Sequence, residues 1–181
     1  GAAGNAIGKM IMRLTGNPVF GADLNEEAVA RFVRDGGTRS SLNEIMSNCD
    51  IVIATTGVPK LIKPEMVRKG QIILALSNPN PEIDPDLALA HGAAFAADGK
   101  SVNNVLGFPG IFRGVVDSNA PRITHEMLIA AMQVLVRMTP AGELMPNPLD
   151  KKVHHDVARA VAETDIKQGI ARAEYVPYNK G

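Results

Sequence analysis

The sequence is poor in cysteine, in aromatic residues and in excess charge of either sign. Its 181 residues include one cysteine, no tryptophan and equal numbers of acidic and basic side chains. The single cysteine, Cys49, excludes an internal disulfide and a cysteine metal cluster. A nonspecific binder of nucleic acid or of a membrane surface needs a basic excess, so we expect neither partner.

Long apolar runs are also absent. No stretch approaches the ~20 apolar residues that cross a membrane, and no charged-then-apolar secretory leader opens the sequence. The length is sufficient for a domain with a real core. We therefore expect a soluble, cytoplasmic protein.

What is present is an alternation of helical patterns with short apolar runs. The runs predict strands at residues 19–22, 50–55, 71–76 and 93–97, and the two central ones have the continuous apolar character of a sheet covered on both faces. Capping residues and apolar spacing predict helices that begin at or just after six residues: Ala6, Asn25, Ser41, Pro64, Asp84 and, after loops, Thr124. Asp150 caps a last helix, and residues 175–181 form a tail.

This order predicts an α/β fold, Rossmann-like and doubly wound, with a mainly parallel sheet and C-terminal helices. We expect a dinucleotide-binding domain over residues 1–140. Residues 141–181 are expected to form a connector, helix and tail that pack on the same domain.

The chain opens with Gly1-Ala2-Ala3-Gly4 before an apolar helix, which is typical of the second half of a glycine-rich dinucleotide loop. The preceding strand and the first glycine of that motif are not in the chain. Asp23 follows the next strand, 19 positions beyond Gly4, which fits a carboxylate that binds the adenosine ribose. It would repel a 2′-phosphate, so NAD is favoured over NADP. The alternatives are a plain small-residue opening and an aspartate that caps a helix.

Two further strand ends carry candidate ligand groups. Thr55-Thr56-Gly57 is small enough for a ribose or pyrophosphate to lie against the backbone, and an ordinary turn is the alternative. Asn78 follows the next strand and is restrained by Pro79 and Pro81, which favours a binding role over a plain turn. Ligands of parallel sheets bind outside these carboxyl ends.

No catalytic or metal-binding residue emerges from the remaining polar groups. The adjacent His154 and His155 point about 100° apart on a helix and cannot share a metal. The acidic cluster Glu82, Asp84 and Asp86 indicates helix capping rather than metal binding.

Two strings are specific: Asn78-Pro79-Asn80-Pro81-Glu82-Ile83 and the run from Asn103-Asn104-Val105-Leu106 to Gly114. With the glycine loop and Pro148-Leu149-Asp150, they resemble the C-terminal, NAD-binding part of bacterial malic enzymes. These enzymes oxidise L-malate with NAD or NADP and decarboxylate the product to pyruvate, using Mg²⁺ or Mn²⁺.

The resemblance implies that Asn78, Asn103 and Asn104 contact malate and the nicotinamide end of the cofactor. It implies that Gly1, Ala2, Ala3 and Gly4 hold the pyrophosphate. The family's catalytic tyrosine and lysine and its acidic metal ligands belong to sequence upstream of the glycine loop. We therefore expect this chain alone to be inactive. We also expect the complete enzyme to be a homo-oligomer, a homodimer, that forms through an N-terminal domain. A non-catalytic dinucleotide-binding or regulatory module is the alternative.

Overall fold

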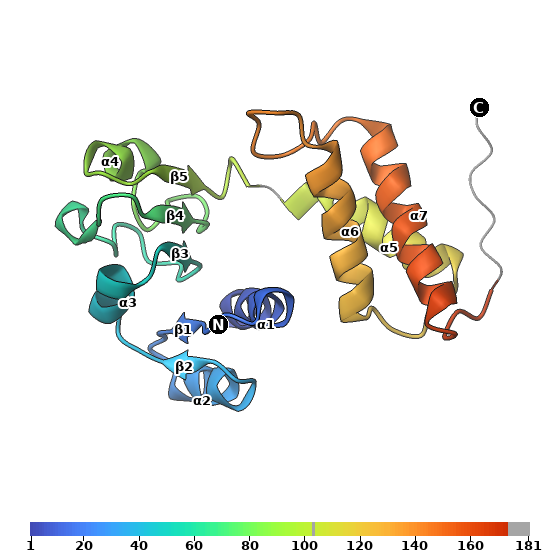
Figure 1. The fold of residues 1–181 in the computed structure, drawn as a ribbon, viewed down its shortest axis with the longest axis horizontal. Coiled ribbons are helices and arrows are strands. Elements are labelled where there is room, and N and C mark those ends of the chain that lie inside the picture. The colour runs from blue at the N-terminus through green and yellow to red at the C-terminus, as the bar shows by residue number, and fades with distance from the viewer. Residues whose placement is uncertain (103, 174–181) are drawn as a thin grey trace. The chain divides into compact units, whose positions relative to one another are not determined.

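The computed structural model describes residues 1–102 and 104–173, which form two compact units (Figure 1). The first unit is Gly1–Val102 and the second is Asn103–Gly181. The boundary differs from the one expected at residue 140, because helices on both sides of that position pack on each other in the second unit. None of the helices described is both long and apolar enough to cross a membrane.

The first unit alternates helices and strands as predicted. Its helices are α1 (Ala2–Thr15), α2 (Glu26–Arg34), α3 (Leu42–Asn48) and α4 (Pro85–Ala90), with a 3-10 turn η1 (Pro64–Met66). Its strands are β1 (Phe20–Gly21), β2 (Thr38–Arg39), β3 (Ile51–Ala54), β4 (Ile72–Ala75) and β5 (Phe95–Asp98). The segment that starts at Pro64 forms a 3-10 turn where we predicted a helix, and β2 was not predicted.

All strand pairs in the described residues are parallel. Strand β1 pairs with β2, and β3, β4 and β5 form a second sheet in that order, with Ala54, Ala75 and Asp98 in register. A doubly wound sheet has the order 3-2-1-4-5-6. The observed orders match it with the strand before the glycine loop left out. The predicted Rossmann-like, mainly parallel fold is confirmed.

Local capping signals fixed several helix starts correctly. Asn25 accepts hydrogen bonds from the backbone of Glu27 and Ala28, at 2.9 and 3.1 Å. Ser41 and Glu44 form the reciprocal capping box that their spacing predicts. Such caps satisfy backbone N–H groups that a helix start leaves free, so the sequence alone reveals them.

The core of the first unit has two parts. One is a layer of apolar side chains on one face of the β3–β5 sheet, with Met46, Ile62 and Ile73 almost fully buried. The cover on both faces that we predicted for the central strands is not found within the first unit, because Ile51 and Phe95 on the opposite face are 56% and 38% exposed. The other is Phe32 of α2, whose ring lies against Gly8, Gly21 and Gly37. A methyl group added to any of these glycines would come within 2.8 Å of the ring. Helix α1, strand β1 and the segment before β2 thus all pack against one aromatic side chain.

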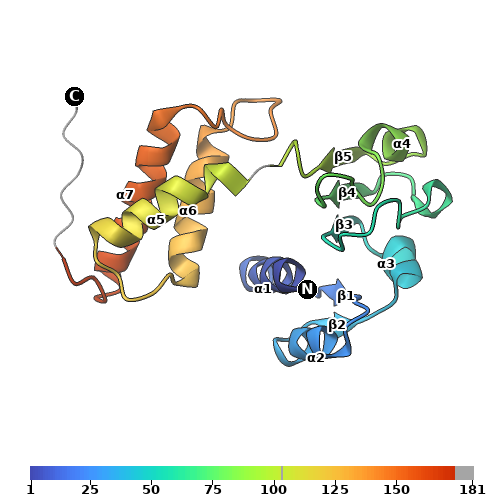
Figure 2. The same cartoon turned by 180° about the vertical axis from the view of Figure 1, so that it is seen from behind.

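The second unit is a helical bundle in which α5 (Phe108–Asp117) crosses α6 (His125–Met138) and α7 (Lys151–Lys167) (Figure 2). A short 3-10 turn, η2 (Asn104–Leu106), precedes α5. Helices α6 and α7 begin at the predicted caps, Thr124 and Asp150. Met127 is fully buried in their core.

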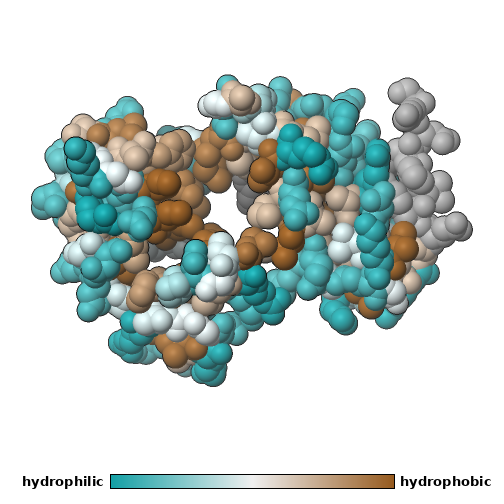
Figure 3. All heavy atoms as spheres, viewed as in Figure 1, coloured by the Kyte–Doolittle hydropathy of each residue, from teal (hydrophilic) through white to brown (hydrophobic). Residues whose placement is uncertain are grey.

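Helix α5 lies in a region that we expected to be loop. Its glycines, Gly110 and Gly114, face α7 so closely that an added methyl group on Gly114 would lie 2.5 Å from the carbonyl oxygen of Ala158. The opposite side carries Phe108, Phe112 and Val116, which are more than half exposed. Figure 3 shows apolar residues, in brown, at the surface of both units. Small residues therefore determine which side of α5 packs.

Replacing Gly114 with alanine is expected to lower the free energy of unfolding of the second unit by about 1–3 kcal/mol, because backbone cannot yield to the added methyl group. Alanine's better helix propensity, about 1 kcal/mol, offsets only part of this. Chemical denaturation followed by circular dichroism measures the change. Val116→Ala on the exposed side is the control, with a change within about 0.5 kcal/mol. Equal stability of G114A and wild type would contradict this packing.

Candidate functional site

The carboxyl ends of the strands bring the predicted cofactor residues of the first unit together. The start of α1 lies beside the end of β1, with the Asp23 carboxylate within hydrogen-bonding distance of the Gly1 nitrogen. The same carboxylate accepts a hydrogen bond from the backbone N–H of Asn25 at 2.9 Å. The Asp23 carboxylate thus lies next to the glycine segment.

Asp23 is not the cap of α2, because Asn25 fills that role. Its side chain is 28% exposed and open to a ligand. Both predicted features, proximity to the glycine segment and a place after β1, are therefore present. Binding of a ribose hydroxyl by Asp23 stays a prediction.

The end of β3 also reaches the glycine segment. A methyl group added to Gly4 would lie 3.2 Å from the Thr55 hydroxyl oxygen, whereas Gly1 has open space around it. The N–H groups of the first turn of α1 have no partner within the helix, which makes a helix start suited to phosphate. The residues present therefore fit a dinucleotide whose pyrophosphate lies at Gly1–Gly4.

Thr56 is held by the buried carboxylate of Glu82, a residue that we expected to cap a helix. Glu82 is fully buried. It accepts hydrogen bonds from the Thr56 N–H (2.6 Å), the Thr56 hydroxyl (2.8 Å) and the Ser77 hydroxyl (2.6 Å). The capping prediction is wrong for Glu82 and right for Asp84, which caps α4.

Burial alone would raise the pKa of Glu82. The hydrogen bonds from Ser77 and Thr56 outweigh that effect and leave the pKa below its usual value. The carboxylate is therefore ionised at neutral pH, and it joins the loop after β3 to the loop after β4. The sequence signal for this role of Glu82 was its place after a strand end, in a motif with two prolines.

Asn78 follows β4 and lies against the loop after β5. Its amide nitrogen is 3.5 Å from the carbonyl oxygen of Gly99, a weak contact. A methyl group on Gly99 would collide with the Asn78 amide and with the carbonyl of Leu76. Asn78 is thus placed at the same edge as Thr55 and Asp23, exposed enough to meet a ligand.

The second amide pair lies at the start of the other unit. Asn103 is outside the described residues, and Asn104 begins η2. Their predicted contacts with substrate and nicotinamide stay predictions.

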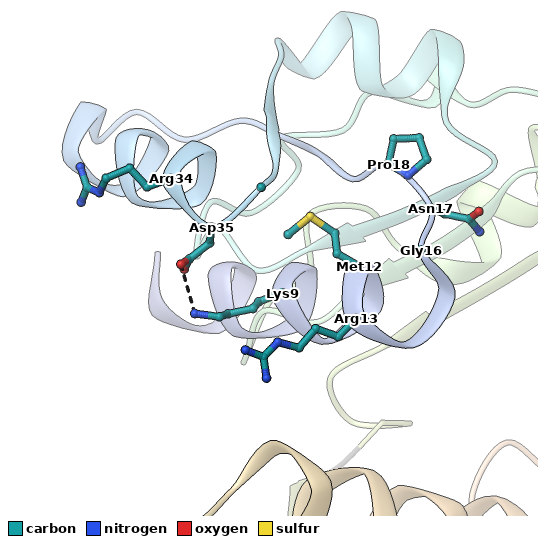
Figure 4. Close-up of a pocket in the computed structure, with 9 residues that line it drawn as sticks. Lys9, Met12, Arg13, Gly16, Asn17, Pro18, Arg34 and Asp35 are labelled. Atoms are coloured by element: carbon teal, nitrogen blue, oxygen red, sulfur yellow. Dashed lines mark hydrogen bonds and ion pairs between the residues drawn. The ribbon is translucent and has the colours of Figure 1, made fainter.

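A shallow hollow on the first unit lies at the other end of its helices (Figure 4). It is lined by the end of α1, by Gly16-Asn17-Pro18 before β1 and by Arg34-Asp35-Gly36 before β2. Lys9 and Asp35 form an ion pair across it at 3.1 Å. Because it adjoins the amino ends of β1 and β2, we do not assign it to the cofactor.

No metal site emerges from the described part of the chain, where no group of three or more His, Cys, Asp and Glu side chains is arranged to hold an ion. His154 bonds to the carbonyl oxygen of Pro148 at 2.8 Å, a structural contact.

The chain is similar to malic enzymes in sequence and in fold. It is 58% identical over 162 residues to NAD-dependent malic enzyme 1 of Bacillus subtilis, covering 89% of this chain and 37% of that protein. It is 34% identical to the NADP-dependent malic enzyme of Salmonella typhimurium, covering 82% of this chain and 23% of that protein. No family model matches it.

The fold comparison agrees. The solved structure of the NAD-dependent malic enzyme of Thermotoga maritima matches with a TM-score of 0.65 and 35% identity. That match covers 77% of this chain and 40% of the solved one. The chain thus spans well under half the length of these relatives.

Proposed function

Because this chain belongs to the malic enzyme family, as its NAD-binding part, we propose that it serves the oxidative decarboxylation of L-malate to pyruvate and CO2 with reduction of NAD. The observation that carries the proposal is the 58% identity to an NAD-dependent malic enzyme over 89% of the chain. The meeting of Asp23, Gly4, Thr55 and Asn78 at one sheet edge supports it.

The proposed roles follow the order of the strands. The start of α1, at Gly1–Gly4, binds the pyrophosphate through its free N–H groups. Asp23 accepts a hydrogen bond from the adenosine ribose. Asn78 holds the nicotinamide end and a malate oxygen with an uncharged amide, which offers both a donor and an acceptor. Bound NAD supplies the hydride acceptor.

The described residues do not form a metal site, so we assign no Mg²⁺ or Mn²⁺ ligand in this chain and derive no step from a metal. We propose that the ion, the general acid and base and the contacts of a homodimer come from sequence outside it. Under this proposal the chain alone is inactive. We also propose a cytoplasmic enzyme that meets neither nucleic acid nor membrane.

Malate-dependent reduction of NAD by the full-length protein, followed at the absorbance of NADH, tests the proposed activity. Pyruvate and CO2 should appear in equal amounts. Tight binding of NAD without any turnover of malate would instead favour a dinucleotide-binding or regulatory module.

Replacing Asp23 with serine is expected to reduce the preference for NAD over NADP by about tenfold or more. The carboxylate favours a ribose hydroxyl through a charge-assisted hydrogen bond and repels a 2′-phosphate, and serine does neither. Kinetic constants for both cofactors in the full-length enzyme measure the change. Asp35→Ser, on the hollow at the opposite end of α1 and α2, is the control. An unaltered preference in D23S would remove the ribose role.

A further inference from the structure

The loop after β3 has its backbone donors turned inward. Three consecutive N–H groups are bonded within the protein: that of Thr56 to Glu82, that of Gly57 to the Ser77 hydroxyl (2.8 Å), and that of Val58 to the Thr56 hydroxyl (3.1 Å). The carbonyl oxygens of residues 55–57 accept no hydrogen bond from the described part of the chain. The backbone of residues 56–58 is therefore short of free donors, whereas the carbonyl groups of residues 55–57 are free acceptors.

The Glu82 carboxylate is the cause of this polarity. An ionised carboxylate only accepts hydrogen bonds, so the hydroxyls of Ser77 and Thr56 both donate their single protons to it. Each hydroxyl then has only lone pairs left, and these accept the N–H groups of Gly57 and Val58. One buried charge thereby sets the direction of every hydrogen bond in the network.

We propose that Glu82 is a positioning residue that makes the loop of residues 55–58 an acceptor surface, which binds hydroxyl groups of the cofactor and disfavours phosphate. This inference rests on the proposed function, since it concerns the same dinucleotide. Phosphate oxygens only accept hydrogen bonds and need donors, and the N–H groups of residues 56–58 are already bonded within the protein. Ribose hydroxyls can donate to the free carbonyls.

The order of the strands indicates which of the two riboses of the dinucleotide meets this loop. The start of α1 lies beside the end of β1 on one side and beside Thr55 on the other. A dinucleotide with its adenosine ribose at Asp23 and its pyrophosphate at α1 then extends across β3. The hydroxyls that meet the acceptor surface are those of the nicotinamide ribose.

Binding of NAD and of ADP to variants of the full-length protein tests this. ADP carries the adenosine and the two phosphates but no second ribose. Thr56→Val removes the hydroxyl at nearly constant shape, which leaves the Val58 N–H without its acceptor and loosens the loop. We expect the Kd of NAD to rise about tenfold or more and the Kd of ADP to stay within about twofold. Thr56→Ser keeps the hydroxyl and should restore NAD binding.

Ser77→Ala, which removes the acceptor of the Gly57 N–H, should act like Thr56→Val and serves if that variant folds poorly. Thr15→Val is the control, because the Thr15 hydroxyl bonds only locally at the far end of α1, to the carbonyl of Ile11 and from the N–H of Asn17. Equal weakening of NAD and ADP, or unchanged NAD binding in both variants, would overturn the proposal. A wild-type protein that binds NAD but does not turn over malate would count against the proposed function alone.

Discussion

Replacing Phe32 with alanine is expected to lower the free energy of unfolding of the first unit by about 3–5 kcal/mol. The ring is 7% exposed and fills the space between Gly8, Gly21 and Gly37. None of these glycines has a side chain that could move into the cavity left behind. The helix α1, the strand β1 and the segment before β2 would all lose the same partner.

Urea denaturation followed by circular dichroism measures this loss in F32A. Val33→Ala is the matched control, because Val33 is the next residue of the same helix and is 46% exposed. Its effect should stay within about 0.5 kcal/mol. Because α1 and β1 carry the glycine segment and Asp23, F32A should also bind NAD more weakly. A loss below about 1 kcal/mol would show that the ring is not packed as described.

Replacing Asn78 with alanine is expected to lower kcat/KM for malate by about ten- to a hundredfold in the full-length enzyme. The amide is expected to form a charge-assisted hydrogen bond with malate, worth about 1.5–3 kcal/mol. Within the first unit its one recorded hydrogen bond is the long contact to Gly99, so folding should be nearly unchanged.

Asn80→Ala is the matched control for Asn78→Ala. Asn80 lies in the same exposed loop and also precedes a proline. It should keep both activity and melting temperature. If N78A melts at a much lower temperature and loses activity in proportion, the amide only ties down its own turn. If kcat/KM is unchanged, Asn78 has no role toward the substrate.

Sequence patterns predicted the first unit better than the second. Its strands β3 and β4 were found because each is a continuous apolar run, although only one face of their sheet is covered within the first unit. Caps such as Ser41 and Asp84 were found because they act within three residues of themselves. Strand β2 was missed because its two residues, Thr38 and Arg39, are exposed and form no apolar pattern.

Helix α5 was missed because Pro109 and two glycines suggested a loop. Proline is tolerated in the first turn of a helix, where its missing N–H is not needed. Gly110 and Gly114 disfavour an isolated helix, but they let α5 approach α7 closely. Conversely, Pro64 starts only a 3-10 turn. In both segments tertiary packing overrode local propensity.

The sequence by itself determined the α/β alternation, the helix caps, the malic enzyme resemblance and the candidates Asp23, Thr55 and Asn78, because each rests on local spacing or on a short motif. Only the tertiary structure decided what Glu82 does. Its hydrogen bond to the Thr56 backbone spans 26 positions of sequence, and no local pattern shows which distant donors a buried carboxylate will meet. The same holds for the ring of Phe32 and for α5, whose partners are brought to them by the fold.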